Sequence, residues 1–337
     1  MPEKPSETSI AMLWAKRYIR FLGEPTFTEV DQRVRIGSSQ DLLHLRTAQK
    51  VKDSLSLVLT QALSLTHQFL DEVIQQQRLD PRYLDPLQIL VDNRKLFEMV
   101  LDVFREGHGP DRLSVQGSWE FGRVRQRYTQ QDGRVLGFVG MHVHYASLGL
   151  LEKLTLSEQA CFEPYLQVMI DHLYIPLRAC YEAAAEHEED SLALQAVQAL
   201  LPRSSEIANL VFEQACLQVP GYHSYSGELI SPAVRQSTIR DIEMFQAYLC
   251  LCLLEDNIRS VQRELFPLCV LLYPRLKVSW EMVRLMIREI EISMQRLIPR
   301  ELVGPFMPYL RDMKDMFSPE VFQELVFISS YGRNSSF

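Results

Sequence analysis

The chain has 337 residues, of which 47% are apolar and 23% are charged, and its formal net charge is −8. This composition is typical of a globular protein, and the length favours two domains over a single hydrophobic core. The negative charge provides no long-range attraction to nucleic acid or to an anionic membrane surface, so we exclude DNA and RNA as main partners.

No stretch of the sequence predicts a membrane helix or a secretion signal. Apolar runs fall short of the roughly 18 residues that a membrane span needs, and the first 14 residues contain no apolar core. Six cysteines occupy apolar contexts without C-x-x-C spacing: Cys161, Cys180, Cys216, Cys250, Cys252 and Cys269. Such usage indicates reduced core cysteines, and we expect a cytoplasmic protein.

Two amphipathic helices are predicted after a polar, irregular stretch of about forty residues. The first lies within residues 41–77, where apolar side chains recur at helical spacing: Leu55, Leu59, Ala62, Leu65, Phe69 and Val73. Two prolines separate it from a second apolar stripe, which ends at Gly107: Leu90, Phe97, Val100, Leu101 and Phe104.

Residues 113–146 change from helical spacing to alternation with a period of two. Apolar side chains occupy alternate positions from Val135 to Tyr145. Asp132-Gly133, just before them, is typical of a tight turn between two strands. The pattern predicts a β-hairpin over these residues.

The predicted hairpin carries two groups of candidate functional side chains. Arg123, Arg125 and Arg127 would share one strand face, where they would bind an acidic protein partner or be solvated. His142 and His144 would share a face of the second strand and provide two ligands for a metal ion, or simply a polar surface. Because no third ligand accompanies the histidines, we predict no metal site.

Helical spacing returns from about residue 155 and continues to 298. We therefore predict a helical domain with a β-hairpin over residues 1–150, a helical domain over residues 151–300, and a C-terminal extension over residues 301–337. The expected fold class is mostly α, with α+β character in the N-terminal part.

One helix of the second domain is expected to lie in the middle of its core. The stretch "STIRDIEMFQAYLCLCLL" (237–254) is polar at its start and apolar on every face from Met244 onward, so other helices must cover it on all sides. Two amphipathic helices follow it. A buried central helix with amphipathic neighbours favours a globin-like arrangement.

The order of motifs around this helix resembles a known family. A loop with two tyrosines precedes an Arg-Asp pair, an apolar helix, an acidic turn and two further helices: Pro220-Gly221, Tyr222, Tyr225, Arg240-Asp241 and Glu255-Asp256-Asn257. Over roughly residues 190–298 this order is similar to the second half of a phycobiliprotein, the family of allophycocyanin and phycocyanin. The resemblance implies a globin-like domain in which Arg240 pairs with a propionate, and Asp241 with the pyrrole N–H groups, of a linear tetrapyrrole.

The sequence departs from the family pattern at the chromophore. Thr238 stands where the family has the cysteine that binds the bilin through a thioether, so we predict no covalently bound cofactor. Arg240 and Asp241 then either solvate the first turn of their helix, contact a noncovalent bilin, or form an ion pair that faces a partner. Cys216 precedes the loop and is interpreted as a buried helical cysteine.

These observations favour a protein that is not an enzyme. The chain contains none of the phosphate-binding, nucleophile-elbow or zinc-protease motifs. The resemblance implies a phycobilisome-related protein, such as one from a cyanobacterium, whose bilin-free domain serves protein–protein interaction or regulation in photosynthesis. Its expected partners are phycobiliproteins, linker proteins or a second copy, through which it would associate with thylakoids. The alternatives are a noncovalent bilin or haem sensor or carrier, and a bilin lyase or other chromophore-processing protein that uses the two histidines.

Overall fold

The computed structural model describes Trp14 and residues 39–322. This part of the chain is mostly helical, as predicted, and contains one small sheet of two antiparallel strands, β1 (His223–Ser224) and β2 (Gly227–Glu228). The chain divides into two compact units, Met1–Glu182 and Ala183–Phe337.

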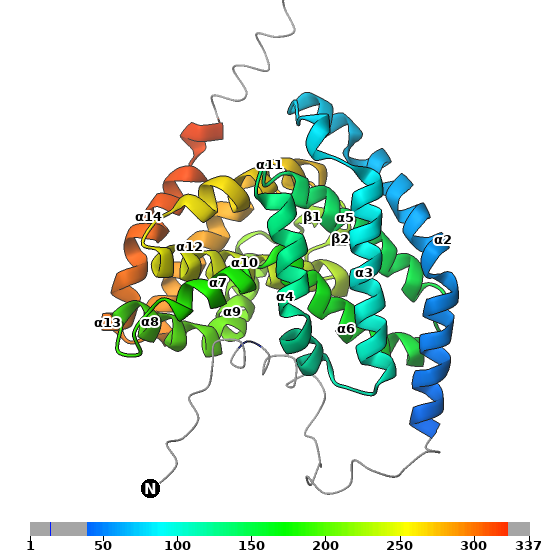
Figure 1. The fold of residues 1–337 in the computed structure, drawn as a ribbon. Coiled ribbons are helices and arrows are strands. Elements are labelled where there is room, and N and C mark those ends of the chain that lie inside the picture. Colours follow the sequence, from blue (N-terminus) through cyan, green and yellow to red (C-terminus); the bar gives the residue numbers. More distant parts are fainter. Residues whose placement is uncertain (1–13, 15–38, 323–337) are drawn as a thin grey trace, which may run out of the picture. The chain divides into compact units, whose positions relative to one another are not determined.

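Long helices build the first unit (Figure 1). They are α2 (Ser39–Gln76), α3 (Pro86–Arg105), α4 (Pro110–Thr129), α5 (Val135–Leu151), α6 (Leu156–Tyr174) and α7 (Leu177–Ala185), with the short 3-10 helix η1 (Pro81–Tyr83) between α2 and α3. Helix α2 packs against α3 and α5, and α6 packs against α4 and α5. The two predicted amphipathic helices are α2 and α3, so that prediction is confirmed.

The helix starts in this unit follow from local sequence. The Asp85 carboxylate accepts hydrogen bonds from the backbone N–H groups of Leu87 and Gln88, and Pro86 stands at the first helical position of α3. Thr155 and Glu158 form a capping box at the start of α6. In each case, side chains satisfy backbone donors that the first turn leaves without a partner.

The predicted β-hairpin is wrong, because residues 113–146 fold into helices α4 and α5. The Asp132-Gly133 pair lies in the short connection between these two helices. Helix α5 is buried on almost every face, and a helix that is apolar all round has no polar positions to reveal its period. In α4, the buried side chains recur at spacings of three and four: Leu113, Gly117, Phe121, Val124 and Tyr128.

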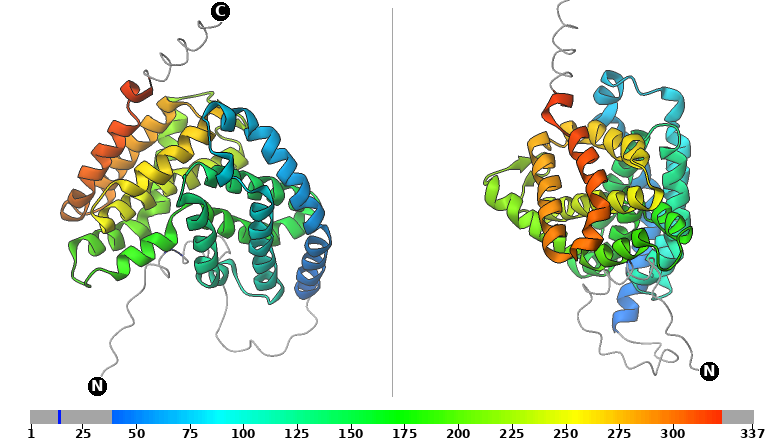
Figure 2. Two further views of the ribbon diagram at one scale, coloured as in Figure 1. Left: turned by 45° about the horizontal axis from the view of Figure 1, so that its top comes forward. Right: turned by 90° about the vertical axis from the view of Figure 1, so that its left-hand side faces the viewer.

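The second unit, which Figure 2 shows in two further views, is also built of helices. They are α8 (Leu192–Leu200), η2 (Leu201–Arg203), α9 (Ser204–Gln218), α10 (Pro232–Glu255), the π-helical turn η3 (Val261–Leu265), α11 (Phe266–Arg275), α12 (Trp280–Leu297), α13 (Arg300–Val303), η4 (Gly304–Phe306) and α14 (Met307–Met316). The π-helical turn ends two residues before Pro267, whose missing N–H cannot continue the regular hydrogen-bond ladder.

Helix α10 lies in the middle of this unit. Every residue from Ile242 to Leu254 is buried, as the apolar sequence predicted. Helices α8, α9, α12 and α14 and the turns η3 and η4 all pack against it. The enclosure removes thirteen consecutive residues from water, and the burial of their apolar side chains stabilises this unit.

The observed division of the chain differs from the predicted one. The boundary lies at Glu182–Ala183 and not near residue 150, so α6 belongs to the first unit. Residues 300–317 form part of the second unit, because α13, η4 and α14 pack in it and contribute buried side chains: Val303, Phe306, Leu310, Met313 and Phe317. Among the residues that the structure describes, no helix is long and apolar enough to cross a bilayer.

Candidate functional site

Arg240 and Asp241 lie in the third turn of α10, eight and nine residues after its start at Pro232. They therefore do not belong to the first turn of the helix, which follows Ser231. The interpretation of the pair as a helix-start feature is wrong. Pro232 begins the helix six residues before Thr238, so Thr238 lies within α10 and not in the loop ahead of it.

Both carboxylate oxygens of Asp241 accept hydrogen bonds from side chains of the same unit. The Arg240 guanidinium donates to Oδ1, with Nη2 at 2.8 Å and Nε at 3.2 Å. The Tyr273 hydroxyl of α11 donates to Oδ2 at 3.2 Å. Since the Arg240 and Asp241 side chains are each 18% exposed, this pair is mostly shielded from solvent.

Tyr273 connects the Arg240-Asp241 pair to the core of the second unit. Its side chain is buried beside the Cys269 thiol, and burial together with the Asp241 charge raises the pKa of Tyr273 well above its ordinary value. Burial likewise raises the pKa of Cys269. Both groups therefore stay protonated at neutral pH, and Tyr273 acts as a hydrogen-bond donor and not as a base.

Aromatic rings surround the Tyr273 end of the cluster. The Trp280 ring lies 6.1 Å from that of Tyr273 and stacks on Phe322, with 4.0 Å between centroids and 18° between planes. Phe317 lies 6.2 Å from Trp280 and contacts the Phe245 ring of α10. These contacts attach the segment that follows α14 to the side of α10 that carries Asp241.

Thr238 and the cysteines of the second unit do not form a pigment-attachment site. Thr238 is half-buried on α10, and Cys216 is half-buried on α9. Burial raises the pKa of the Cys216 thiol, which makes it a poor nucleophile. Cys250 and Cys252 are buried core residues, as predicted, and the pKa of Cys252 rises to about 11, mainly through burial.

The two histidines do not share a face, which corrects the prediction of a common strand surface. His142 is fully buried: its Nε2–H donates to the Leu59 carbonyl of α2 at 2.9 Å, and its Nδ1 accepts from Asn93 Nδ2 of α3 at 2.8 Å. His144, two residues on, lies about 200° around the helix and is partly exposed. No group of three or more His, Cys, Asp or Glu side chains suited to a metal ion occurs in the described part of the chain.

The three arginines also separate, because α4 is a helix and not a strand. Arg125 is buried, whereas Arg123 and Arg127 lie one turn apart on the outward side. Arg123 pairs with Glu120, and Arg127 Nη1 lies 2.5 Å from a carboxylate oxygen of the buried Asp92. The predicted single face of three arginines is therefore wrong.

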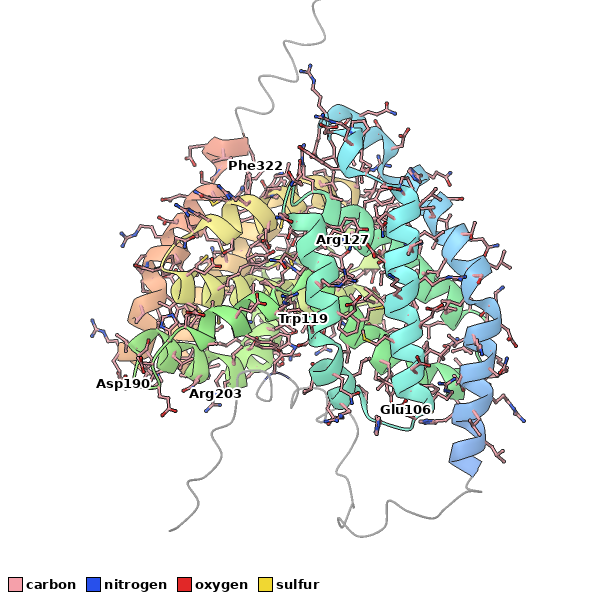
Figure 3. The ribbon with its side chains drawn as sticks, viewed as in Figure 1. Glu106, Trp119, Arg127, Asp190, Arg203 and Phe322 are labelled. Carbon is pink, nitrogen blue, oxygen red and sulfur yellow. The ribbon has the colours of Figure 1, made fainter. Side chains whose placement is uncertain are left out.

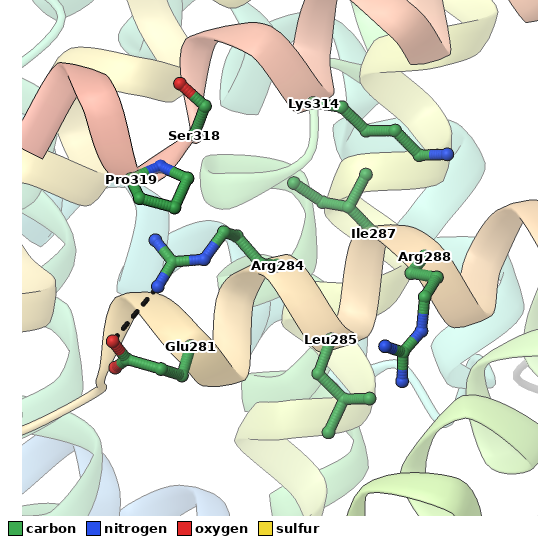
Figure 4. Close-up of a pocket in the computed structure, with 8 residues that line it drawn as sticks. All are labelled: Glu281, Arg284, Leu285, Ile287, Arg288, Lys314, Ser318 and Pro319. Carbon is green, nitrogen blue, oxygen red and sulfur yellow. Dashed lines mark hydrogen bonds and ion pairs between the residues drawn. The ribbon is translucent and has the colours of Figure 1, made fainter.

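A groove of about 500 Å³ lies between α12 and the end of α14 in the second unit (Figure 4). Its lining residues are Glu281, Arg284, Leu285, Ile287, Arg288, Lys314, Ser318 and Pro319. Arg284 pairs with Glu281 at 3.0 Å, and Lys314 pairs with Glu291. Because these cations have carboxylate partners in the same unit, the groove has no excess charge that would select an anion.

The loop of residues 219–231 is held firmly against the connection between α11 and α12. The Tyr222 hydroxyl donates to the Lys277 carbonyl at 3.1 Å and accepts from the Ser279 N–H at 3.0 Å. The Tyr225 N–H donates to the Leu276 carbonyl at 2.9 Å. The loop presents exposed apolar side chains on this fixed backbone, Tyr225 and Ile230, of which Ile230 is 69% exposed.

The sequence reasoning missed the contacts that define this site. Tyr273 follows Asp241 by 32 residues, and no local pattern connects the two. No family model matches the chain, and no curated protein and no solved structure matches it at a significant level.

Proposed function

We propose that the second unit is a bilin-free, phycobiliprotein-like domain of globin-like type that acts as a protein-interaction module and not as an enzyme. The supporting observation is that both carboxylate oxygens of Asp241 already accept hydrogen bonds, one from Arg240 and one from Tyr273. A ligand that used Asp241 as an acceptor would have to displace one of these donors. Thr238 provides a hydroxyl where the family attaches its pigment.

The burial of α10 agrees with this proposal, because a phycobiliprotein-like domain has a central helix that its neighbours enclose. The polar groups of α10 near residue 241 then serve stability rather than pigment binding. What remains available for function is the outer surface of the unit. The proposed partners are phycobiliproteins, their linker proteins or a second copy of the chain, as the sequence resemblance implies.

The 219–231 loop is the proposed contact surface. Tyr225 and Ile230 project from a backbone that Tyr222 fixes to Lys277 and Ser279, so little conformational entropy is lost when a partner binds. Exposed apolar side chains on a rigid support are typical of the central residues of protein interfaces.

Replacing both Tyr225 and Ile230 with Ser is expected to weaken binding to the partner at least about tenfold, because it removes the apolar centre of the contact. The measurement is fluorescence anisotropy with purified allophycocyanin and phycocyanin, with sedimentation equilibrium to detect a second copy. Leu192→Ser is the matched control, since Leu192 is also exposed but lies on α8. Absence of binding to all of these probes would overturn the proposal.

The purified chain is expected to take up no tetrapyrrole when it is mixed with biliverdin. The visible spectrum of the pigment and the melting temperature of the protein should both stay unchanged, because the Asp241 oxygens already have donors. A stoichiometric complex with a shifted absorption band, lost in Asp241→Asn, would instead support a noncovalent tetrapyrrole carrier.

A further inference from the structure

The first unit carries a second exposed surface, which the proposed function does not use. Helix α4 presents Arg112, Val115, Trp119 and Arg123 at spacings of three and four, so they form one outward stripe. Helix α3 packs against α4, and its exposed Lys95 helps to lower the pKa of Glu120, the residue next to Trp119. We call these five residues the Trp119 face; Figure 3 labels Trp119 itself.

Trp119 is unusual because a large aromatic side chain remains mostly exposed. Its side chain is 63% exposed, although the Arg178 guanidinium lies 3.7 Å from the centre of its ring. Burying an indole ring removes a large apolar area from water, so a partner that covered Trp119 would gain binding free energy.

The Trp119 ring is held in place by residues of the same unit. Arg178 is only 15% exposed and its Nε donates to Glu182 at 2.8 Å. The aliphatic part of Arg178 lies on Gly122, where an added Cβ would collide with it. Arg178 therefore has little freedom to move away, and the opposite side of the Trp119 ring is presented in a fixed orientation. A fixed aromatic side chain loses little entropy on binding.

The charge around Trp119 is positive in a chain whose net charge is negative. Helix α4 contains four arginines, but Arg125 is buried and Arg123 and Arg127 pair with Glu120 and Asp92. The positive charge available on the Trp119 face therefore comes from Lys95 and Arg112. In the described part of the chain, neither Lys95 nor Arg112 forms an ion pair, so both remain available to carboxylates of a partner. A twofold contact between two copies would bring these like charges together, which disfavours self-association through this face.

We propose that the Trp119 face binds an acidic amphipathic helix of a partner protein. The apolar side chains of that partner helix would cover Trp119 and Val115, and its carboxylates would pair with Lys95 and Arg112. The stripe from Arg112 to Arg123 covers about 16 Å of α4, which corresponds to three turns of a partner helix lying along it. This surface belongs to the first unit, so the proposal is independent of the function proposed for the second.

The test uses a fluorescein-labelled peptide of about 18 residues, built from Glu and Leu in an amphipathic helical pattern. Anisotropy with the full chain should show saturable binding that weakens at high salt. Trp119→Ala is expected to weaken binding at least tenfold, and Lys95→Glu with Arg112→Glu should weaken it at low salt. Leu57→Ser, an exposed position on α2, should leave binding unchanged.

Three results would overturn the proposal. The first is that a basic peptide of Lys and Leu in the same pattern binds as tightly as the acidic peptide. The second is that Trp119→Ala binds the acidic peptide as tightly as the natural chain does. The third is that the acidic peptide does not bind, whereas the chain dimerises and Trp119→Ala abolishes the dimer. Circular dichroism of each variant separates a loss of binding from a loss of folding. Val115→Asp provides a second variant of the same stripe, and it should also weaken binding because it places a carboxylate against the acidic helix.

Discussion

Replacing Tyr248 with Ala lowers the free energy of unfolding of the second unit by about 3–5 kcal/mol. Tyr248 is among the largest fully buried side chains and lies in the enclosed part of α10. Truncation to Ala removes the ring from a site packed on all sides, and the cavity cannot collapse because several helices line it. Hydrogen exchange of the α10 backbone measures this loss locally.

Tyr248→Phe is the matched control for this prediction. It keeps the ring and removes the hydroxyl that donates to Glu264 Oε2 at 3.2 Å, so we expect a loss of only about 1 kcal/mol. If Tyr248→Ala cost no more than Tyr248→Phe, the packing of α10 in the middle of the unit would be contradicted.

The second prediction with a large expected effect is that the first unit loses stability at acidic pH. His142 is buried and neutral, with its two ring nitrogens bonded to Leu59 and Asn93, and burial lowers its pKa. In the unfolded chain a histidine titrates near pH 6.5, so below that pH the unfolded state binds a proton that the folded state does not. We therefore expect the stability contributed by neutral His142 to be complete above that pH, and to be lost as the pH falls from about 6.5 toward the lower pKa of the folded state.

His142→Gln tests this prediction, since Gln has both a donor and an acceptor and does not titrate. The variant is expected to be less stable than the natural chain at pH 7.5, because Gln does not fill the imidazole site. Its free energy of unfolding should depend less on pH between 7.5 and 5.5, with a difference in slope of at most about 1.4 kcal/mol per pH unit. Urea unfolding at a series of pH values measures both quantities, and equal slopes for the two proteins would contradict a neutral buried histidine.

The arrangement of His142 also explains why it is unsuitable for catalysis or metal binding. Each nitrogen already has a partner from a different helix, so the ring joins α2, α3 and α5. A ligand would have to break one of these buried bonds without water to replace it. A chromophore-processing site built on His142 and His144 therefore has no geometric basis, since the two side chains lie on different sides of α5.

The two proposed interaction surfaces differ in chemistry, and this makes them separable by experiment. The 219–231 loop presents the apolar side chains Tyr225 and Ile230, whereas the Trp119 face combines Trp119 and Val115 with the cations Lys95 and Arg112. Binding through the loop should therefore depend weakly on salt, and binding through the Trp119 face strongly.

Helical spacing in the sequence was sufficient to predict α2, α3 and the buried helix α10. Each contains a clear change between apolar and polar positions or, in α10, an almost continuous apolar run from Met244 to Leu254 that only a core can accept. The same reasoning failed for α4 and α5. In α5, apolar residues lie on nearly all faces of the helix, so the sequence also fits the period of two that is typical of a strand. In α4, the alternation of Arg123, Arg125 and Arg127 concealed the helical spacing of Leu113 and Phe121.

The sequence by itself determined the helical class, the core position of four of the six cysteines, the absence of a thiol at residue 238 and the buried position of α10. These properties depend on residue type and on spacing within one helix, which the linear chain contains directly. Only the tertiary structure decided that Asp241 is bonded to Tyr273, that His142 joins three helices and that Arg178 lies on Trp119. Such partners are distant in sequence, and a polar side chain binds whichever donor or acceptor the packing of other helices brings within about 3 Å.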